Sequence, residues 1–140
     1  MGQPSTIYKP GRLNYVWNYL GTTLKEFKAK LLGYRVYTAS LSQTGSADPV
    51  VTVHENSLGQ EIVWTRQSIG TYVGTATGLF AVPNYSKVAL LCSQTANSSL
   101  GVTVAYRNSN DDVYVETFDF GGAVADGVLS ESLIEIRIYN

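Results

Sequence analysis

The sequence has one cysteine and one histidine among 140 residues, and this scarcity limits its chemistry. Cys92 has no second cysteine with which to form an internal disulfide. Thiol pairs and zinc clusters need more cysteine or histidine than the chain contains. A dyad of Cys92 and His54 remains, and nothing in their spacing supports it. We therefore expect no catalytic residues, no metal site and no cofactor.

These two residues have ordinary structural interpretations. Cys92 ends a strand-like run that starts at Lys87, which predicts a small apolar side chain packed in the interior. His54 follows Val51 and Val53 in an alternating segment, so it is predicted to lie on the opposite face, at the surface or in a polar pocket.

The chain also lacks long apolar runs and has few charges. No stretch of about 18 apolar residues exists, which predicts the absence of a membrane-spanning segment. Residues 1–9 lack the features of a secretory signal, so we expect synthesis in a reducing cytoplasm. Charged residues make up only 15% of the chain, while 39 of 140 residues are Ser, Thr, Asn or Gln. This composition favours short strands joined by turns.

The charges are unevenly distributed. Residues 1–35 carry a net charge of +5, from six basic residues and Glu26. Residues 36–140 carry a net charge of −6, from four basic and ten acidic residues. A basic N-terminal segment thus precedes an acidic body.

Residues 1–33 are predicted to form an anchoring segment. Proline and glycine in residues 1–12 predict an extended arm, and residues 13–20 fit either a strand or a short helix. The segment from Thr23 to Glu26 matches the Ser/Thr-x-x-Glu capping box, and Gly33 is a helix stop, which predicts a helix of about nine residues. Its apolar positions are Leu24, Phe27 and Leu31. A helix this short must dock on something, and one end of the body is one candidate.

From Tyr34 onward the pattern is that of strands. Segments rich in β-forming residues alternate with turn clusters at a spacing of roughly 10 to 14 residues. The expected strands are 34–41, 50–55, 61–66, 71–75, 87–92, 101–107, 113–118 and 133–139. Residues 34–140 are therefore predicted to form an antiparallel β-sandwich, jelly-roll-like and mainly β. In the last strand, Ile134, Ile136 and Ile138 share one face, and this strand is expected to pair inside a sheet.

Two motifs are of a kind found in ligand-binding sites, but their details favour a purely structural role. The glycines between Gly70 and Gly78 are not followed by Gly-Lys-Ser/Thr, so a curved strand or bulge is favoured over a phosphate loop. Asp111, Asp112 and Asp119 lack the calcium-loop pattern. A solvated loop is favoured there, and weak calcium binding stays an alternative.

The candidate binding residues lie in the anchoring segment, where aromatic and basic side chains are interleaved. They are Tyr8, Lys9, Arg12, Tyr15, Trp17, Tyr19, Lys25, Lys28 and Lys30. These residue types are typical of protein interfaces and also of nucleic-acid binding. The acidic body and the small net charge of the segment argue against nucleic acid, so a protein partner is expected.

One block of the sequence resembles a known group of proteins. Residues 34–45 contain Tyr-x-Val-Tyr-x-Ala-x-Leu-x-Gln-x-Gly, and residues 55–66 contain Glu-Asn-x-Leu-Gly-x-x-Ile-Val-Trp-x-Arg. Together with Gly70–Gly74, this block is similar to one in small proteins of bacteriophages that infect Bacteroidetes and of related integrated phages. The resemblance covers about 45 of the 140 residues. It implies a virion structural protein, such as a head fibre or capsid decoration, and assigns no functional residues.

The leading hypothesis is a non-enzymatic component of the phage virion that docks on the capsid, or on other virion proteins, through residues 1–33. We expect a homo-oligomer, with a trimer favoured over a dimer, and neither nucleic acid nor membrane as a partner. A second hypothesis is a host-surface or glycan-binding tip that uses Tyr72, Tyr106 and Tyr114. A hydrolase is disfavoured because no ordered catalytic set is evident.

Overall fold

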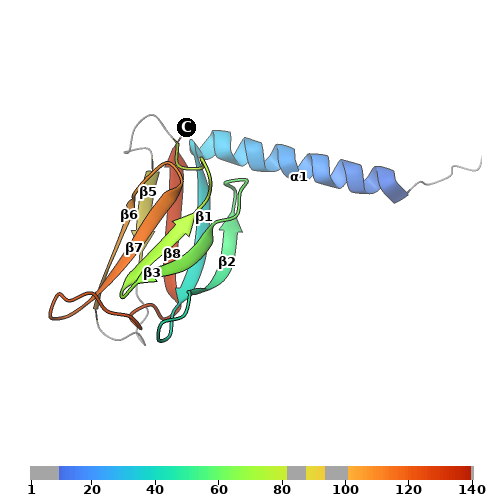
Figure 1. Ribbon diagram of the computed structural model, residues 1–140. Helices are drawn as coiled ribbons and strands as arrows, with labels where there is room; N and C mark the ends of the chain where they lie inside the picture. The colour runs from blue at the N-terminus through green and yellow to red at the C-terminus, as the bar shows by residue number, and fades with distance from the viewer. Residues whose placement is uncertain (1–9, 82–87, 94–100, 140) are drawn as a thin grey trace, which may run out of the picture. The chain divides into compact units, whose positions relative to one another are not determined.

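The computed structural model describes residues 10–81, 88–93 and 101–139. Internal contacts divide the chain into two units, Met1–Gly33 and Tyr34–Asn140, which are described separately. In the described residues, the first unit holds helix α1, Pro10–Leu32, and the second holds eight strands (Figure 1).

Helix α1 is longer than the sequence indicated. It spans 23 residues from Pro10, so the predicted nine-residue helix is wrong, and so is the extended arm over residues 10–12. The rest of that arm, residues 1–9, lies outside the described residues. Proline suits a helix start, because its fixed φ is helical and its missing N–H would have no partner there. Gly33 ends the helix with a φ of 73°, which confirms the predicted stop.

The predicted capping box at Thr23 is also wrong, because Thr23 lies inside α1. The Thr23 hydroxyl donates a hydrogen bond to the Tyr19 carbonyl oxygen at 2.9 Å, and the Thr22 hydroxyl donates to the Asn18 carbonyl oxygen at 3.0 Å. A hydroxyl bonded to the preceding turn is compatible with a helix interior. The Thr-x-x-Glu pattern therefore occurs here without a helix start.

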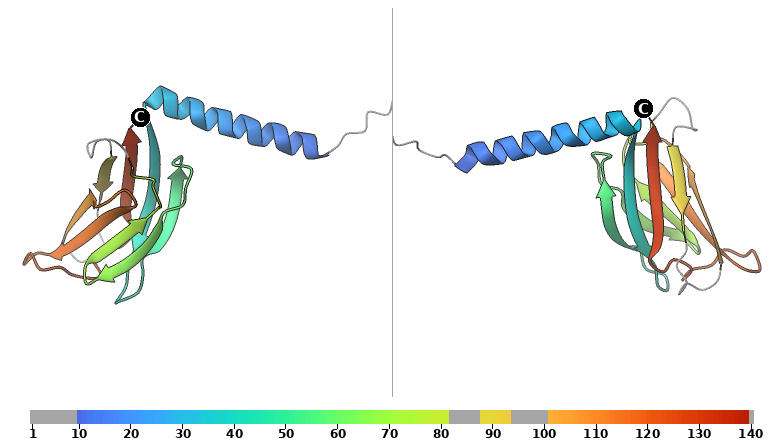
Figure 2. Two further views of the ribbon diagram at one scale, coloured as in Figure 1. Left: turned by 45° about the horizontal axis from the view of Figure 1, so that its top comes forward. Right: turned by 180° about the vertical axis from the view of Figure 1, so that it is seen from behind.

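The second unit is a sandwich of two four-stranded antiparallel sheets (Figures 1 and 2). The first sheet has the order β2-β1-β8-β5 and the second has the order β3-β4-β7-β6. The strands are β1 Tyr34–Ser42, β2 Val50–Asn56, β3 Val63–Ser68, β4 Thr71–Thr75, β5 Val88–Cys92, β6 Gly101–Arg107, β7 Asp112–Asp119 and β8 Ser132–Tyr139. Each corresponds to a predicted strand with shifts of no more than two residues, and the predicted sandwich is confirmed.

The core lies between the two sheets and is built from alternate residues of their strands. Ile134, Ile136 and Ile138 on β8 are at most 1% exposed, and β8 pairs with both β1 and β5, as predicted for this last strand. The Trp64 indole on β3 donates a hydrogen bond to the Tyr37 hydroxyl on β1 at 3.3 Å. This bond links the two sheets across the core.

Glycine at position 74 is required by packing. A Cβ on Gly74 would come within 2.9 Å of both the Trp64 ring and the Ile62 side chain, which are buried. Gly70 and Gly78 flank this strand in turns with φ of 63° and 67°. Gly74 thus lies in a strand, as its sequence predicted, and Gly70 and Gly78 lie in the turns that flank it.

Candidate interaction surfaces

The nine predicted anchoring residues all belong to the first unit. Tyr8 and Lys9 lie outside the described residues. The backbone positions of Arg12, Tyr15, Trp17, Lys25 and Lys28 are helical. The side chains of Tyr19 and Lys30 are exposed, with 63% of Tyr19 accessible. Their role in docking stays a prediction.

The helix places these anchoring positions on two faces. Successive residues of an α-helix are rotated by about 100°, so position 15 lies one turn from Tyr19 on the same face. Lys30, three turns further on, lies within about 20° of Tyr19 by the same rotation. Position 17 lies roughly 160° away from Tyr19. We call the side of α1 that carries Tyr19 and Lys30 the aromatic-basic face, and Trp17 is not part of it.

The outer face of the second sheet carries a tyrosine patch, formed by Val102, Val104, Tyr106 and Tyr114. Tyr106 pairs with Tyr114 across β6 and β7, and their ring centroids are 5.7 Å apart. The Tyr106 hydroxyl lies 2.9 Å from Glu116 Oε1 in a hydrogen bond. Burial and this hydrogen bond raise the pKa of Tyr106. Val102, Val104 and Tyr106 are exposed, so the patch offers apolar and aromatic surface to a partner.

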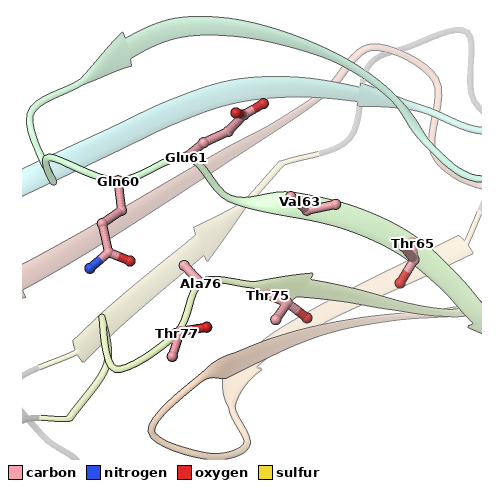
Figure 3. Close-up of a pocket in the computed structure, with 7 residues that line it drawn as sticks. All are labelled: Gln60, Glu61, Val63, Thr65, Thr75, Ala76 and Thr77. Atoms are coloured by element: carbon pink, nitrogen blue, oxygen red, sulfur yellow. The ribbon is translucent and has the colours of Figure 1, made fainter.

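A shallow hollow lies on the same face of the second sheet (Figure 3). Thr65 pairs with Val73, and Val73 pairs with Tyr114, so one cross-strand row runs from β3 to the tyrosine patch. The hollow has a volume of about 560 Å³, and its polar lining residues are Gln60, Glu61, Thr65, Thr75 and Thr77. Hydroxyl, amide and carboxylate groups there can bond a polar ligand.

Tyr72, which the glycan hypothesis grouped with Tyr106 and Tyr114, lies elsewhere, so this part of the hypothesis is wrong. Tyr72 neighbours Val73 along β4 and therefore faces the interior, where it is 0% exposed. Its hydroxyl donates a hydrogen bond to Gln43 Oε1 at 3.0 Å, and burial raises its pKa to about 12. Tyr72 is thus a core residue with a bonded hydroxyl.

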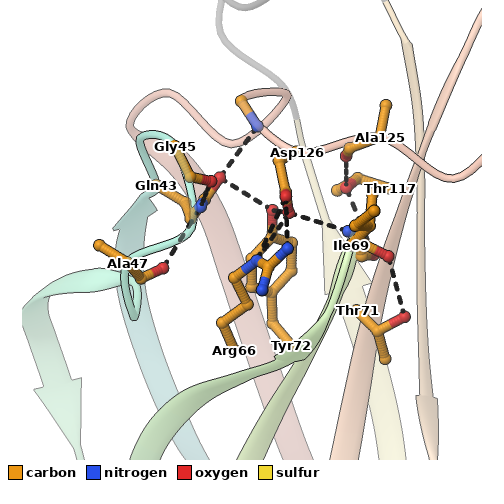
Figure 4. A network of polar contacts seen from close by, with 12 residues as sticks. Gln43, Gly45, Ala47, Arg66, Ile69, Thr71, Tyr72, Thr117, Ala125 and Asp126 are labelled. Atoms are coloured by element: carbon orange, nitrogen blue, oxygen red, sulfur yellow. Dashed lines mark hydrogen bonds and ion pairs between the residues drawn. The ribbon is translucent and has the colours of Figure 1, made fainter.

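Tyr72 also contacts a polar network centred on Asp126, in the connection between β7 and β8 (Figure 4). The Arg66 guanidinium donates hydrogen bonds to both Asp126 oxygens, the shortest at 2.7 Å from Nη2 to Oδ2. The Gly70 backbone N–H donates to Asp126 Oδ1 at 2.9 Å. The hydrogen bond from Arg66 holds the pKa of Asp126 below its ordinary value. The ionised carboxylate therefore ties the β3–β4 turn to the β7–β8 connection.

Gln43 extends this network to the β1–β2 connection. Its Oε1 accepts a hydrogen bond from the Gly127 N–H at 2.9 Å, and its Nε2 donates to the Ala47 carbonyl oxygen at 3.3 Å. Three chain connections are thus fastened together at one end of the sandwich. Sequence analysis missed this network, because its charged partners Arg66 and Asp126 are 60 residues apart and no local pattern relates them.

His54 and Cys92 lie at opposite edges of the first sheet, on β2 and β5. Two strands separate them, and at a strand spacing of about 4.8 Å their backbones are roughly 14 Å apart, too far for a dyad. His54 is exposed and its Nε2 lies 2.7 Å from Ser40 Oγ, which confirms the predicted surface position. Cys92 packs against the core, and burial raises the pKa of its thiol to about 11.

The loop aspartates organise turns. Asp111 accepts a hydrogen bond from the Gly78 N–H, and Asp119 accepts one from the Ala123 N–H. Asp112 accepts a hydrogen bond from the Thr75 hydroxyl at 2.9 Å. Among the described residues, no three His, Cys, Asp or Glu side chains gather as a metal site. In the same part of the chain, no helix combines the length and apolar character needed to cross a membrane.

Comparison of the chain with protein-family models, with curated proteins and with solved structures finds no match.

Proposed function

We propose that the chain is a non-enzymatic structural protein of a bacteriophage virion, a head fibre or capsid decoration that docks on the capsid through residues 1–33. The observation that carries the docking role is the exposed aromatic-basic face of α1, which belongs to a unit separate from the sandwich. The resemblance of residues 34–74 to small phage proteins supports the virion as its place.

The charge distribution supports docking through residues 1–33, with the sandwich directed away from the capsid. Residues 1–35 carry a net charge of +5 and residues 36–140 a net charge of −6. An acidic capsid surface would attract the first segment and repel the second, so complementarity would orient the protein with its body outward. The sandwich supplies a rigid body, because its described core residues come from its own strands and connections.

Deletion of residues 1–33 tests this proposal. The deletion should leave a folded sandwich that no longer co-sediments with particles of the phage whose genome encodes the chain. In the full chain, Tyr19→Ala should weaken attachment, whereas Phe120→Ala, at an aromatic residue of the body that is exposed at least as much, should not. If the deleted chain still decorates particles normally, the anchor lies in the body and the proposal is wrong.

Salt dependence separates capsid docking from nucleic-acid binding. Docking through buried aromatic anchors should respond only partly to salt. Binding to nucleic acid should lose close to one log unit of affinity per log unit of salt for each phosphate neutralised. A steep slope with purified DNA or RNA would favour the alternative.

A second candidate function, recognition of host-surface glycans, is favoured by the tyrosine patch and the adjoining hollow. Tyr106 and Tyr114 offer ring faces, and the threonines of the hollow offer hydroxyl groups on the same face of the sheet. Sugar rings have apolar faces edged by hydroxyl groups, which this combination can match.

Two tyrosines with matched exposure test the glycan function. Tyr106 is 36% exposed in the patch, and Tyr139 is 37% exposed and lies 5.4 Å from the Tyr34 ring on the first sheet. Binding to bacterial envelopes or to a glycan array should fall with Tyr106→Ala and persist with Tyr139→Ala. Equal binding by both variants and the full chain would exclude the patch.

A further inference from the structure

The apolar residues of α1 form a regular row, separate from the aromatic-basic face. Leu20, Leu24, Phe27 and Leu31 follow one another at spacings of four, three and four residues. Trp17 and Leu13 continue the same spacing towards the N-terminus in the sequence. Alternate positions of this row are seven residues apart, at 13, 20 and 27 and at 17, 24 and 31, which is the heptad repeat of coiled coils. We call these six positions the apolar seam.

The described part of the seam is open. Leu20, Leu24, Phe27 and Leu31 are 44%, 65%, 62% and 75% exposed. By the helical rotation, Tyr19 lies about 80° around the helix from Phe27 and about 100° or more from Leu20, Leu24 and Leu31. Docking through the aromatic-basic face would therefore leave the seam available to another partner.

The spacing identifies the kind of partner. A straight α-helix has 3.6 residues per turn, so a row with a 3.5-residue step stays in contact only with a helix that supercoils around it. A helix packed on a globular body has a wider apolar stripe that includes e or g positions. In α1, with Leu24 and Leu31 at a positions, the e and g positions near the described seam are Gly21, Thr23, Lys28 and Lys30. The narrow seam fits a second helix with the same repeat.

A second copy of this chain supplies that helix. Every copy carries the same heptad positions on α1, so α1 of a second copy has the matching repeat. With Leu24 and Leu31 at a positions, Thr23 occupies a g position and Lys28 an e position. In a parallel pair, a g position faces the e position five residues further along the neighbouring helix, so Thr23 faces Lys28 of the other copy. No two lysines of α1 then face each other across the seam. Lys25 and Glu26 occupy the outer b and c positions.

We propose that three copies of the chain associate through α1 as a parallel three-stranded coiled coil. The a positions of the seam are Trp17, Leu24 and Leu31, and they lack the β-branched residues that favour two-stranded coils. Three parallel helices around a threefold axis form a closed assembly, in which every copy buries the same seam. This association does not depend on the proposed role in a virion, so a result that contradicts one proposal does not contradict the other.

Sedimentation of the full chain and two matched variants tests the proposal. The full chain should sediment at three times 15.2 kDa at high micromolar concentration. Leu24→Glu places a charge in the seam and should give a 15.2 kDa particle with reduced helicity. Tyr19→Glu is the control, because Tyr19 is equally exposed on another face, and it should keep the three-chain mass. Phe27→Glu should repeat the result of Leu24→Glu.

Several results would overturn the proposal. A full chain that stays at 15.2 kDa at that concentration would show that the seam packs within its own chain or on a different partner. An assembly that survives both Leu24→Glu and Phe27→Glu would place the contact in the sandwich. A two-chain mass abolished by Leu24→Glu would overturn the threefold arrangement. The thermal transition of the sandwich checks that each variant keeps a folded body.

Discussion

Helix α1 and the sandwich use apolar residues in opposite ways. The sandwich hides Ile134 and Ile136 completely, while α1 exposes Leu24 and Leu31 to 65% and 75%. A core of this kind stabilises its own unit, whereas an exposed apolar row stabilises nothing until a partner covers it. The comparison indicates that burial within its own unit stabilises the body, and the proposed association would stabilise α1 in the same way.

The largest expected difference between the two regions is in the loss of stability when one apolar side chain is shortened in each. Ile136→Ala should lower the free energy of unfolding of the sandwich by about 2–5 kcal/mol, because it leaves a cavity between the sheets. Leu24→Ala should change it by less than about 0.5 kcal/mol. Chemical denaturation followed by the strand signal in circular dichroism measures both. Equal losses would mean that α1 is part of the sandwich core.

The same glycine substitution should have opposite signs in the two regions. Gly74→Ala should destabilise the sandwich by about 1–3 kcal/mol, because the new Cβ meets the Trp64 ring and Ile62 at 2.9 Å. Gly21→Ala should strengthen α1 by up to about 1 kcal/mol, because no atom lies within 4 Å of the new Cβ. Thermal unfolding and helicity report the two effects. A stable Gly74→Ala variant would contradict the close packing of β4 against β3.

Asp126 should make the sandwich sensitive to acid. Its pKa is lower in the folded protein than in the unfolded chain, so its ion pair stabilises the fold at neutral pH. This stabilisation is lost as the pH falls below the ordinary aspartate pKa of about 3.9 and through the lower folded value. Asp126→Asn should lower stability at neutral pH and leave little difference from the parent below that range. Thermal unfolding against pH measures this, and a difference that is constant with pH would contradict it.

The smallest effect is expected at the two residues that a catalytic role would need. His54→Ala together with Cys92→Ala should leave particle attachment intact and lower stability only modestly, because the residues lie at opposite edges of the first sheet. Co-sedimentation and thermal unfolding check the double variant. Loss of a hydrolytic activity in a folded double variant would contradict the structural role.

The strands were predictable because their signal is local. In β8, the alternation of Ile134, Ile136 and Ile138 with polar residues requires only neighbouring positions, and the buried face follows from it. Helix α1 was predicted too short, because the cap motif at Thr23 and the proline and glycine in residues 1–12 outweighed the periodic apolar residues. Capping motifs and single glycines are weak signals beside a sustained repeat.

Local sequence was sufficient to place the strands, the β-sandwich class and the helix stop at Gly33, because each depends on residues within a few positions of one another. Tertiary structure decided the sheet order, the burial of Tyr72 and the clamp between Arg66 and Asp126. These features depend on which segments meet in space. Arg66 and Asp126 are 60 residues apart and meet only in the tertiary fold, and no local pattern encodes that meeting.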